Sequence, residues 1–461
     1  MKNLLFIVVT VMCVSSCTKN SFITSKEAAV AFSADTVFFD TVFVSTGSVT
    51  QSVKIINPNS QKLHLTDIRL MGGAQSYFAI NIDGSPGPEV TGVDLDAGDS
   101  LYIFVAVAIN PNSANLPFIV QDSIQVAFNG NLEYIQLQAW GQNANFLRNV
   151  VLTANTVWNS TLPYVIQGSL QIDTGATLTI PAGCKVYFHA DAPLLVDGSL
   201  QVNGTDSNRV LFTGDRLDAP YNGYPGSWPG IWFRGASSND LLQYAMVENA
   251  DEAVVVSAAP AGTTPKVVLQ QCIVNNSYDA GILGLDGSIQ AVNCLISNCG
   301  QNVILGGGYY NFIQCTAAAY SNNYIAHMEP VLAVTDEILY GSSLYTGAVQ
   351  ASFVNCIFWG NYGNVPDEVV VSQQTTNSFV VGFSNCLWKV QDLPTGVTSA
   401  NMIANQDPLF DSVNTAANYY DFHLQANSPA IAAGTAAGVM IDLDGMPRPA
   451  VAPDLGCYQR Q

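Results

Sequence analysis

Two different hydrophobic rhythms divide the chain. From about residue 30 to residue 144, apolar and polar residues alternate in short runs, which turn clusters such as 57–60, 84–88 and 110–112 separate. A period of two predicts β-strands that bury one face. About seven such strands within roughly 115 residues predict an antiparallel β-sandwich. We place this sandwich at residues 28–147.

The second half repeats with a longer period. Its strands are joined through glycines and asparagines without hairpin turns, and an amide followed by a cysteine recurs five times: Gln271-Cys272, Asn293-Cys294, Gln314-Cys315, Asn355-Cys356 and Asn385-Cys386. The successive separations of these cysteines along the chain are 22, 21, 41 and 30. We interpret these spacings as one coil, one coil, about two coils, and one coil carrying a loop.

A repeat with a period of about 21 to 22 residues predicts a parallel β-helix. We place it at residues 148–461, with a C-terminal cap region from about residue 400. A leucine-rich repeat would instead show leucine at most core positions and a helix in each repeat, and neither pattern is present. The predicted fold class is therefore all-β, a sandwich followed by a β-helix.

The beginning of the chain, residues 1–17, has the pattern of an export signal. Lys2 precedes an apolar run from Leu4 to Val14, and the segment ends Val-Ser-Ser-Cys at Cys17. The run of about 11 residues is shorter than the roughly 20 of a membrane-spanning helix, so we expect its removal. The ending resembles the lipobox of bacterial lipoproteins, which implies that Cys17 is acylated and that residues 18–27 form a tether. An ordinary signal peptide containing cysteines is the alternative.

The repeated cysteines and amides have a structural interpretation. Equivalent residues on successive coils lie about 4.8 Å apart with parallel Cα–Cβ bonds, whereas a disulfide needs converging Cβ atoms about 3.8 Å apart. We therefore expect a ladder of reduced, buried cysteines, although an exported protein meets an oxidising compartment. The amides at the bends can satisfy backbone groups that a sharp corner leaves unpaired.

Charge narrows the range of partners. The 461 residues carry 15 basic and 35 acidic side chains, a formal net charge of −20. Such a chain repels polyanions, which argues against nucleic acid as a partner.

Motifs in both halves of the chain resemble known families. Residues 178–183 (Leu-Thr-Ile-Pro-Ala-Gly), 228–233 (Trp-Pro-Gly-Ile-Trp-Phe), 407–410 (Asp-Pro-Leu-Phe) and 453–456 (Pro-Asp-Leu-Gly) resemble right-handed parallel β-helix lipoproteins of the Bacteroidetes with a choice-of-anchor Q region. The alternating segment around residues 52–68 resembles immunoglobulin-like spacer modules. Cys457 and Gln459 depart from the small residue and acid that usually flank the final tyrosine.

The irregular segment 213–230 is the first candidate site. It contains Asp215, Arg216, Tyr221, Tyr224 and Trp228. Aromatic rings offer flat faces on which sugars stack, while Asp and Arg bind hydroxyl groups. We therefore predict a carbohydrate-binding surface. The alternative for the tryptophan is that it covers the core.

A lyase of this fold would need a base for the proton α to a uronate carboxylate and a cation for the resulting anion. His327 and Glu329 lie among tyrosines, and Lys185 and Arg234 are candidate cations. No spacing predicts that these residues share a face, and a lone histidine is more often structural.

Carboxylates give a third group of candidates. Asp442 and Asp444, in an Asp-x-Asp-Gly run, are possible Ca²⁺ ligands, and Glu248, Asp279 or Asp286 is a possible member of a hydrolase acid/base pair. Such runs are common turns and the full EF-hand spacing is absent. No Cys-His cluster has zinc-ligand spacing. We therefore predict no bound metal and no cofactor.

Two functional hypotheses remain open. The first is a non-catalytic cell-envelope lipoprotein, attached to the outer membrane through its lipid, whose β-helix binds a glycan or an envelope protein. The second is a polysaccharide lyase or glycoside hydrolase acting on a cell-surface or dietary polysaccharide, which fold analogy alone supports. Residues 18–21 lack the acidic run that resembles a surface-export signal, so the side of the membrane stays open.

Overall fold

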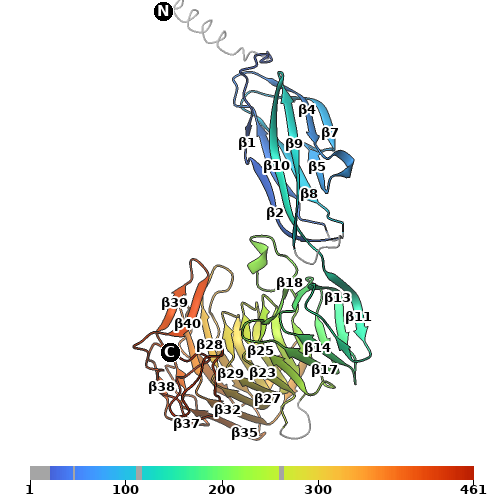
Figure 1. The fold of residues 1–461 in the computed structure, drawn as a ribbon. Helices are drawn as coiled ribbons and strands as arrows, with labels where there is room; N and C mark the ends of the chain where they lie inside the picture. Colours follow the sequence, from blue (N-terminus) through green and yellow to red (C-terminus); the bar gives the residue numbers. More distant parts are fainter. Residues whose placement is uncertain (1–20, 45–46, 111–116, 259–263) are drawn as a thin grey trace, which may run out of the picture. The chain divides into compact units, whose positions relative to one another are not determined.

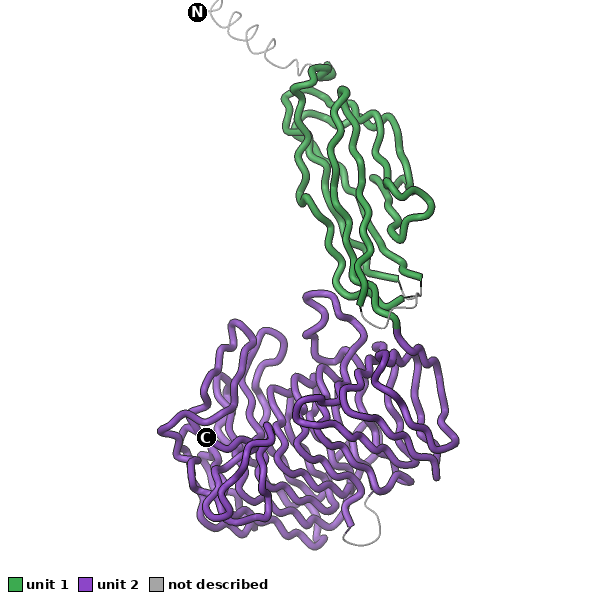
Figure 2. The backbone as a smooth tube through the Cα atoms, viewed as in Figure 1, with its two compact units in different colours: residues 1–143 green, residues 144–461 purple. Residues whose placement is uncertain are grey.

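The chain forms two compact units, residues 1–143 and 144–461 (Figure 2). The computed structural model describes residues 21–44, 47–110, 117–258 and 264–461, so Cys17 and the export signal lie outside the described residues. Apart from two short 3-10 helices, η1 (Gly73–Gln75) and η2 (Tyr221–Gly223), the regular elements are β-strands. In the described ranges no helix is long and apolar enough to cross a membrane.

The first unit is a sandwich of two five-stranded sheets (Figure 1). In order, the first sheet contains β1 (Ala31–Phe32), β3 (Gln51–Ile56), β8 (Ser100–Val107), β5 (Phe78–Ile82) and β6 (Ser85–Pro86). The second contains β2 (Thr36–Phe43), β10 (Asn131–Gln142), β9 (Phe118–Phe128), β4 (Leu63–Leu70) and β7 (Glu89–Leu95). The predicted sandwich is confirmed, with one difference.

That difference is a parallel pair: β2 runs parallel to β10, with Val37 opposite Leu137. Alternation reveals which residues are buried but not which strands pair. On β8, for example, Leu101 and Ile103 are buried while Tyr102 and Phe104 face outward.

The second unit winds 26 strands into a parallel β-helix with three faces. Face A contains β16 (Leu194–Val196), β19 (Ile231–Phe233), β22 (Glu252–Ser257), β29 (Leu332–Thr335) and β34 (Val369–Ser372). Face B contains β12 (Thr156–Val157), β14 (Thr177–Pro181), β17 (Ser199–Asn203), β20 (Asp240–Gln243), β23 (Val267–Gln270), β32 (Val349–Val354), β35 (Phe379–Ser384) and β37 (Val397–Ala400).

Face C contains β15 (Lys185–Phe188), β18 (Val210–Gly214), β21 (Ala245–Glu248), β24 (Ile273–Asn275), β26 (Leu295–Ser297), β28 (Thr316–Tyr320), β33 (Ile357–Asn361), β36 (Leu387–Trp388) and β38 (Ile403–Ala404). Four long strands bend between faces: β11 (Asn145–Leu152), β13 (Tyr164–Ile172), β25 (Ala280–Val292) and β27 (Gln301–Ile313). Two antiparallel hairpins project from the coils: β30 (Glu337–Tyr340) with β31 (Ser343–Thr346), and β39 (Phe410–Asn414) with β40 (Tyr419–Leu424).

The amide and cysteine repeat lies at the corner between faces B and C. The amides occupy left-handed backbone positions, which asparagine tolerates better than most residues: Gln271, Asn293, Gln314, Asn355 and Asn385. The cysteines that follow them are buried and free, which confirms the reduced ladder. Burial holds the pKa of the Cys294 and Cys315 thiols well above its ordinary value.

One predicted spacing is wrong. The segment between Cys315 and Cys356 forms a single coil, because Thr316 pairs directly with Ile357. The additional length is an insertion that includes the β30–β31 hairpin. Hydrophobic periodicity cannot distinguish a second coil from a long excursion that returns to the same register.

The C-terminal region covers the outer surface of face C. Phe410, Phe422 and Leu424 pack there against Leu295 and Trp359. The corner amides pair with this region rather than only with neighbouring coils. Asn293 donates through Nδ2 to the carbonyl of Ile441. In the same way, Asn355 donates to the carbonyl of Thr435, and Asn385 donates to the carbonyl of Ala433. The segment predicted as a cap therefore lies along one side of the β-helix.

Candidate functional site

A groove lies on face C next to the surface that the C-terminal region covers. Two adjoining hollows of about 210 and 430 Å³ share Glu248, Asn275, Asn418 and Tyr420, so they form one groove. We call it the amide groove. Its remaining lining residues are Asn222, Gly223, Met246, Asn249, Ile273, Asn276, Leu295, Ser297, Asn298, Asn322, Tyr419, Asp421, Phe422, His423 and Tyr458.

The floor of the amide groove follows from the register of the coils. Glu248 pairs with Asn275, and Asn275 pairs with Ser297, on three consecutive strands of face C. Alternate residues on a strand point to opposite faces. Neighbouring residues such as Val247 and Val274 fill the core, so the polar set lines up on the outside.

An amide network holds the wall that the 213–230 segment contributes. Asn276 donates through Nδ2 to the Gly223 carbonyl at 2.9 Å and to Asn249 Oδ1 at 2.7 Å. Asn249 in turn donates to the Asn222 carbonyl and to Thr213 Oγ1, each at 3.1 Å. Asn276 is only 5% exposed, and its Oδ1 has no partner among the described residues. One acceptor beside the groove is therefore left unsatisfied.

Glu248 brings a carboxylate to the groove floor. Among the described residues, no hydrogen bond or ion pair involves this side chain; its backbone carbonyl accepts from Trp228 Nε1 at 2.9 Å. Burial raises the pKa of Glu248 above its ordinary value. The groove therefore holds a partly desolvated acid with no protein counter-charge.

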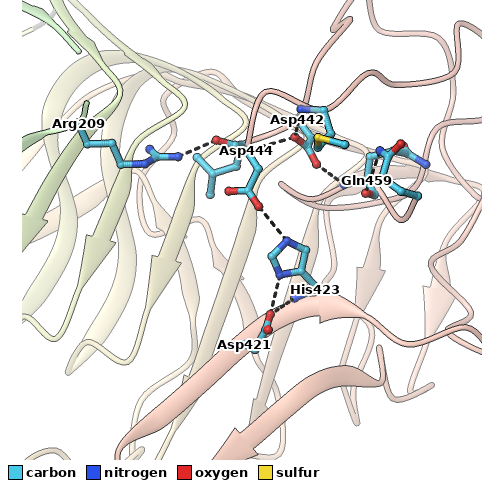
Figure 3. Close-up of polar contacts among 9 residues, drawn as sticks. Arg209, Asp421, His423, Asp442, Asp444 and Gln459 are labelled. Atoms are coloured by element: carbon cyan, nitrogen blue, oxygen red, sulfur yellow. Dashed lines mark hydrogen bonds and ion pairs between the residues drawn. The ribbon is translucent and has the colours of Figure 1, made fainter. Parts of the chain in front are cut away.

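At the other end of the groove, His423 lies between two carboxylates (Figure 3). Its Nδ1 contacts Asp421 Oδ1 at 2.6 Å, and its Nε2 contacts Asp444 Oδ2 at 2.9 Å. The bond to Asp444, with that to Asp421, raises the pKa of His423 to about 9. The imidazolium therefore joins the β39–β40 hairpin to the loop after Asp442.

The Asp442 run is a turn. Asp442 Oδ1 accepts from the backbone N–H of Asp444 and of Met446, and Oδ2 accepts from the N–H of Gln459 (Figure 3). These bonds confirm the turn interpretation. Within the part of the chain that the structure describes, no group of three or more His, Cys, Asp or Glu residues could hold a metal ion.

The His423 contacts predict a pH dependence. Because its folded pKa of about 9 exceeds the ordinary 6.5, the stabilisation is complete below about pH 6.5 and is lost as the pH rises through about 9. We expect the amides of β40 to exchange hydrogen faster above pH 9 than the intrinsic rate increase explains. A His423→Gln variant should show no such step. A step of equal size in both proteins would contradict the assignment.

The predicted sugar-binding segment is partly exposed. Arg216 pairs with Asp218 at 2.7 Å and lies 4.1 Å from the Tyr221 ring centroid. The Tyr224 ring lies 5.2 Å from Tyr221 and 5.1 Å from Tyr324. Asp215, whose pKa burial raises, contacts His189 at 2.8 Å. The tyrosines therefore form an exposed aromatic cluster beside Asn222 and Gly223, at the rim of the groove.

The prediction that Trp228 contributes to a sugar-binding surface is wrong. It is 0% exposed, and its ring stacks on Phe188 with centroids 4.2 Å apart. A side chain without accessible surface cannot stack on a sugar. Trp228 belongs to the β-helix core, as the alternative interpretation held.

The structure does not bring the predicted lyase residues together. His327 is buried and pairs with Glu368 at 2.9 Å, whereas Glu329 is exposed. Arg234 pairs with Asp197. Lys185 is exposed on face C, two coils from Met246 of the groove. His327 and Glu329 therefore do not act together, because the buried histidine contacts the buried acid on the neighbouring coil.

One comparison with known proteins agrees with the β-helix architecture. Residues 150–257 match the family model of the pectate-lyase-like β-helix domain. A search of curated proteins gave no match.

Among solved structures, the chain is similar to a family 123 glycoside hydrolase from Clostridium perfringens, studied for glycolipid glycan hydrolysis. The identity is 10% over 26% of this chain and 30% of that chain, with a TM-score of 0.19. The ASH / PapD-like domain 7 of human CEP192 matches at 8% identity over 28% of this chain and 92% of that domain, with a TM-score of 0.18. This chain thus spans about a third of the hydrolase, and neither likeness bears on activity. The protein contains a parallel β-helix, part of which is similar to the pectate-lyase-like β-helix domain, and this β-helix follows an N-terminal β-sandwich.

Proposed function

We propose that the protein binds a glycan in the amide groove. The observation that supports this proposal is the composition of the lining, which combines asparagine amides with tyrosines and carboxylates. Amides offer both donors and acceptors, which suits sugar hydroxyl groups, and tyrosine rings offer stacking faces with a polar tip. The exposed Tyr224 and Tyr324 extend this surface beyond the groove.

A glycan array followed by calorimetry tests the proposal. We expect binding of at least one oligosaccharide and, for Tyr224→Ala and Asn275→Ala, about tenfold weaker affinity, equal to ~1.4 kcal/mol. Tyr102→Ala is the matched control, because Tyr102 is an exposed aromatic residue on the sandwich. The proposal fails if both groove variants bind as the unmodified protein does.

We propose further that the protein is a lipoprotein of the outer membrane, anchored through Cys17 and carrying its sandwich as a spacer. The anchor rests on the Val-Ser-Ser-Cys ending. We expect Cys17→Ala to abolish incorporation of a labelled fatty acid and to release the protein from the membrane fraction. Cys13→Ala, at a cysteine within the apolar run, is the control and should keep the label. Labelling that survives Cys17→Ala would refute the anchor.

A glycoside hydrolase is the second candidate. Glu248 and Asp421 line the same hollow. Burial raises the pKa of Glu248, whereas His423 outweighs burial and holds the pKa of Asp421 below its ordinary value. Two carboxyl groups with separated pKa values are the acid/base arrangement of glycosidases. Release of reducing ends from a bound oligosaccharide, lost in both Glu248→Gln and Asp421→Asn, would favour this candidate over a non-catalytic binder.

A further inference from the structure

The charge of the amide groove is opposite to that of a uronate-binding site. Its described lining includes the carboxylates of Glu248 and Asp421 but no lysine or arginine. Among the described lining residues, only His423 carries positive charge, and two carboxylates share it. The lining together with Asp444 therefore contributes net negative charge.

Two guanidinium groups on neighbouring segments are already engaged. Arg216, on the wall segment, pairs with Asp218. Arg209 donates to the carbonyls of Gln271 and Leu443, beneath the C-terminal region. Neither guanidinium is available to an acidic sugar in the groove.

The unpaired Glu248 carboxylate lies on the groove floor beside the amides of Asn275 and Asn276. A partly buried carboxylate without a counter-charge is costly. A second negative charge beside it would raise that cost, whereas a ligand ammonium group would remove it. An ammonium group has three donors, and the Glu248 carboxylate is an acceptor on this floor.

We infer that the amide groove selects glycans that contain a free amino sugar, whose ammonium group pairs with Glu248, and rejects uronate chains. The inference rests on the proposed glycan binding and specifies its ligand class. This ligand class differs from the polyuronates that the name of the pectate-lyase-like domain suggests. A fold does not determine the chemistry of its surface, so the two need not agree.

Calorimetry on the full-length protein in detergent tests the inference with three probes of equal length: oligomers of glucosamine, of N-acetylglucosamine and of galacturonate. We expect the glucosamine oligomer to bind about tenfold or more tightly than the N-acetylated one, and galacturonate not to bind in Ca²⁺ or in EDTA. Glu248→Gln should weaken glucosamine binding by about tenfold to a hundredfold and remove the preference over the N-acetylated oligomer. Glu133→Gln, at an exposed glutamate of the sandwich, should change neither.

The outcomes distinguish a failure of the amino-sugar inference from a failure of the proposed glycan binding. Equal affinity for the two hexosamine oligomers, or a preference that Glu248→Gln leaves intact, overturns the amino-sugar assignment while glycan binding stands. Galacturonate binding that requires Ca²⁺ overturns it as well and would indicate a metal bridge. The comparison of probes on the unmodified protein needs no variant, so the inference stays falsifiable if Glu248→Gln does not fold. No binding to any of these probes or to any glycan of the array defeats the proposed function itself.

Discussion

Replacing Trp228 by alanine should lower the free energy of unfolding of the β-helix by about 3–5 kcal/mol, the range for large-to-small changes at aromatic core residues. The ring is fully buried and stacks on Phe188. Its removal also leaves the Glu248 carbonyl without the indole donor, which adds the cost of an unpaired buried acceptor. Urea unfolding followed by near-ultraviolet circular dichroism measures the change.

Two companion variants separate packing from sugar contact. Trp228→Phe keeps an aromatic ring but loses the indole hydrogen bond, so we expect a smaller loss of about 1–2 kcal/mol. Tyr224→Ala removes an exposed ring and should change stability by no more than about 0.5 kcal/mol. If Trp228→Ala were as stable as Tyr224→Ala yet lost glycan binding, Trp228 would be a surface contact and the core assignment would fall.

The coil period is readable in the sequence because it is local. Each coil repeats the same requirement at its B–C corner, where an amide such as Asn293 adopts a left-handed conformation and a small apolar residue such as Cys294 fills the core behind it. The repeat pattern does not predict where an insertion occurs. Between Cys315 and Cys356 the chain leaves the helix and returns in register, so only the separation of the cysteines records it.

The sequence does not predict the amide groove, for a different reason. Its floor repeats with the coils, but its walls come from the 213–230 segment and from the β39–β40 hairpin, far apart in the chain. Glu248 is one of three carboxylates that the sequence suggests for a hydrolase acid/base pair, with Asp279 and Asp286. Neither of the other two lines the described groove. No pattern indicates which of the three the C-terminal region will enclose, because that depends on where this region packs.

Three other corner asparagines show how one residue type serves two purposes. Asn249, Asn276 and Asn298 occupy left-handed corner positions, as a stacking role requires. The same three residues line the groove. A prediction that assigns amides at the bends only a structural role therefore finds the fold and misses the site.

Asn355 is where the loss of one corner amide should be most damaging, because its side chain holds the C-terminal region. Its Nδ2 donates to the Thr435 carbonyl and its Oδ1 accepts from the Thr435 N–H, both at 2.8 Å, in a fully buried position. Alanine would leave both backbone groups unpaired, at a cost of about 1–3 kcal/mol each. It would also occupy a φ of +57°, which costs roughly 1–2 kcal/mol without asparagine.

We therefore expect Asn355→Ala to destabilise the protein by about 3 kcal/mol or more and to speed hydrogen exchange first at residues 433–436. Asn239→Ala is the matched control, since Asn239 has a φ of +56° and its side chain is exposed, so it reports the backbone cost alone. Equal losses in the two variants would show that the pairing with Thr435 contributes nothing. A larger loss at Asn355, with weakened glycan binding, would show that the corner amides hold the wall of the groove as well as the turn of the coil.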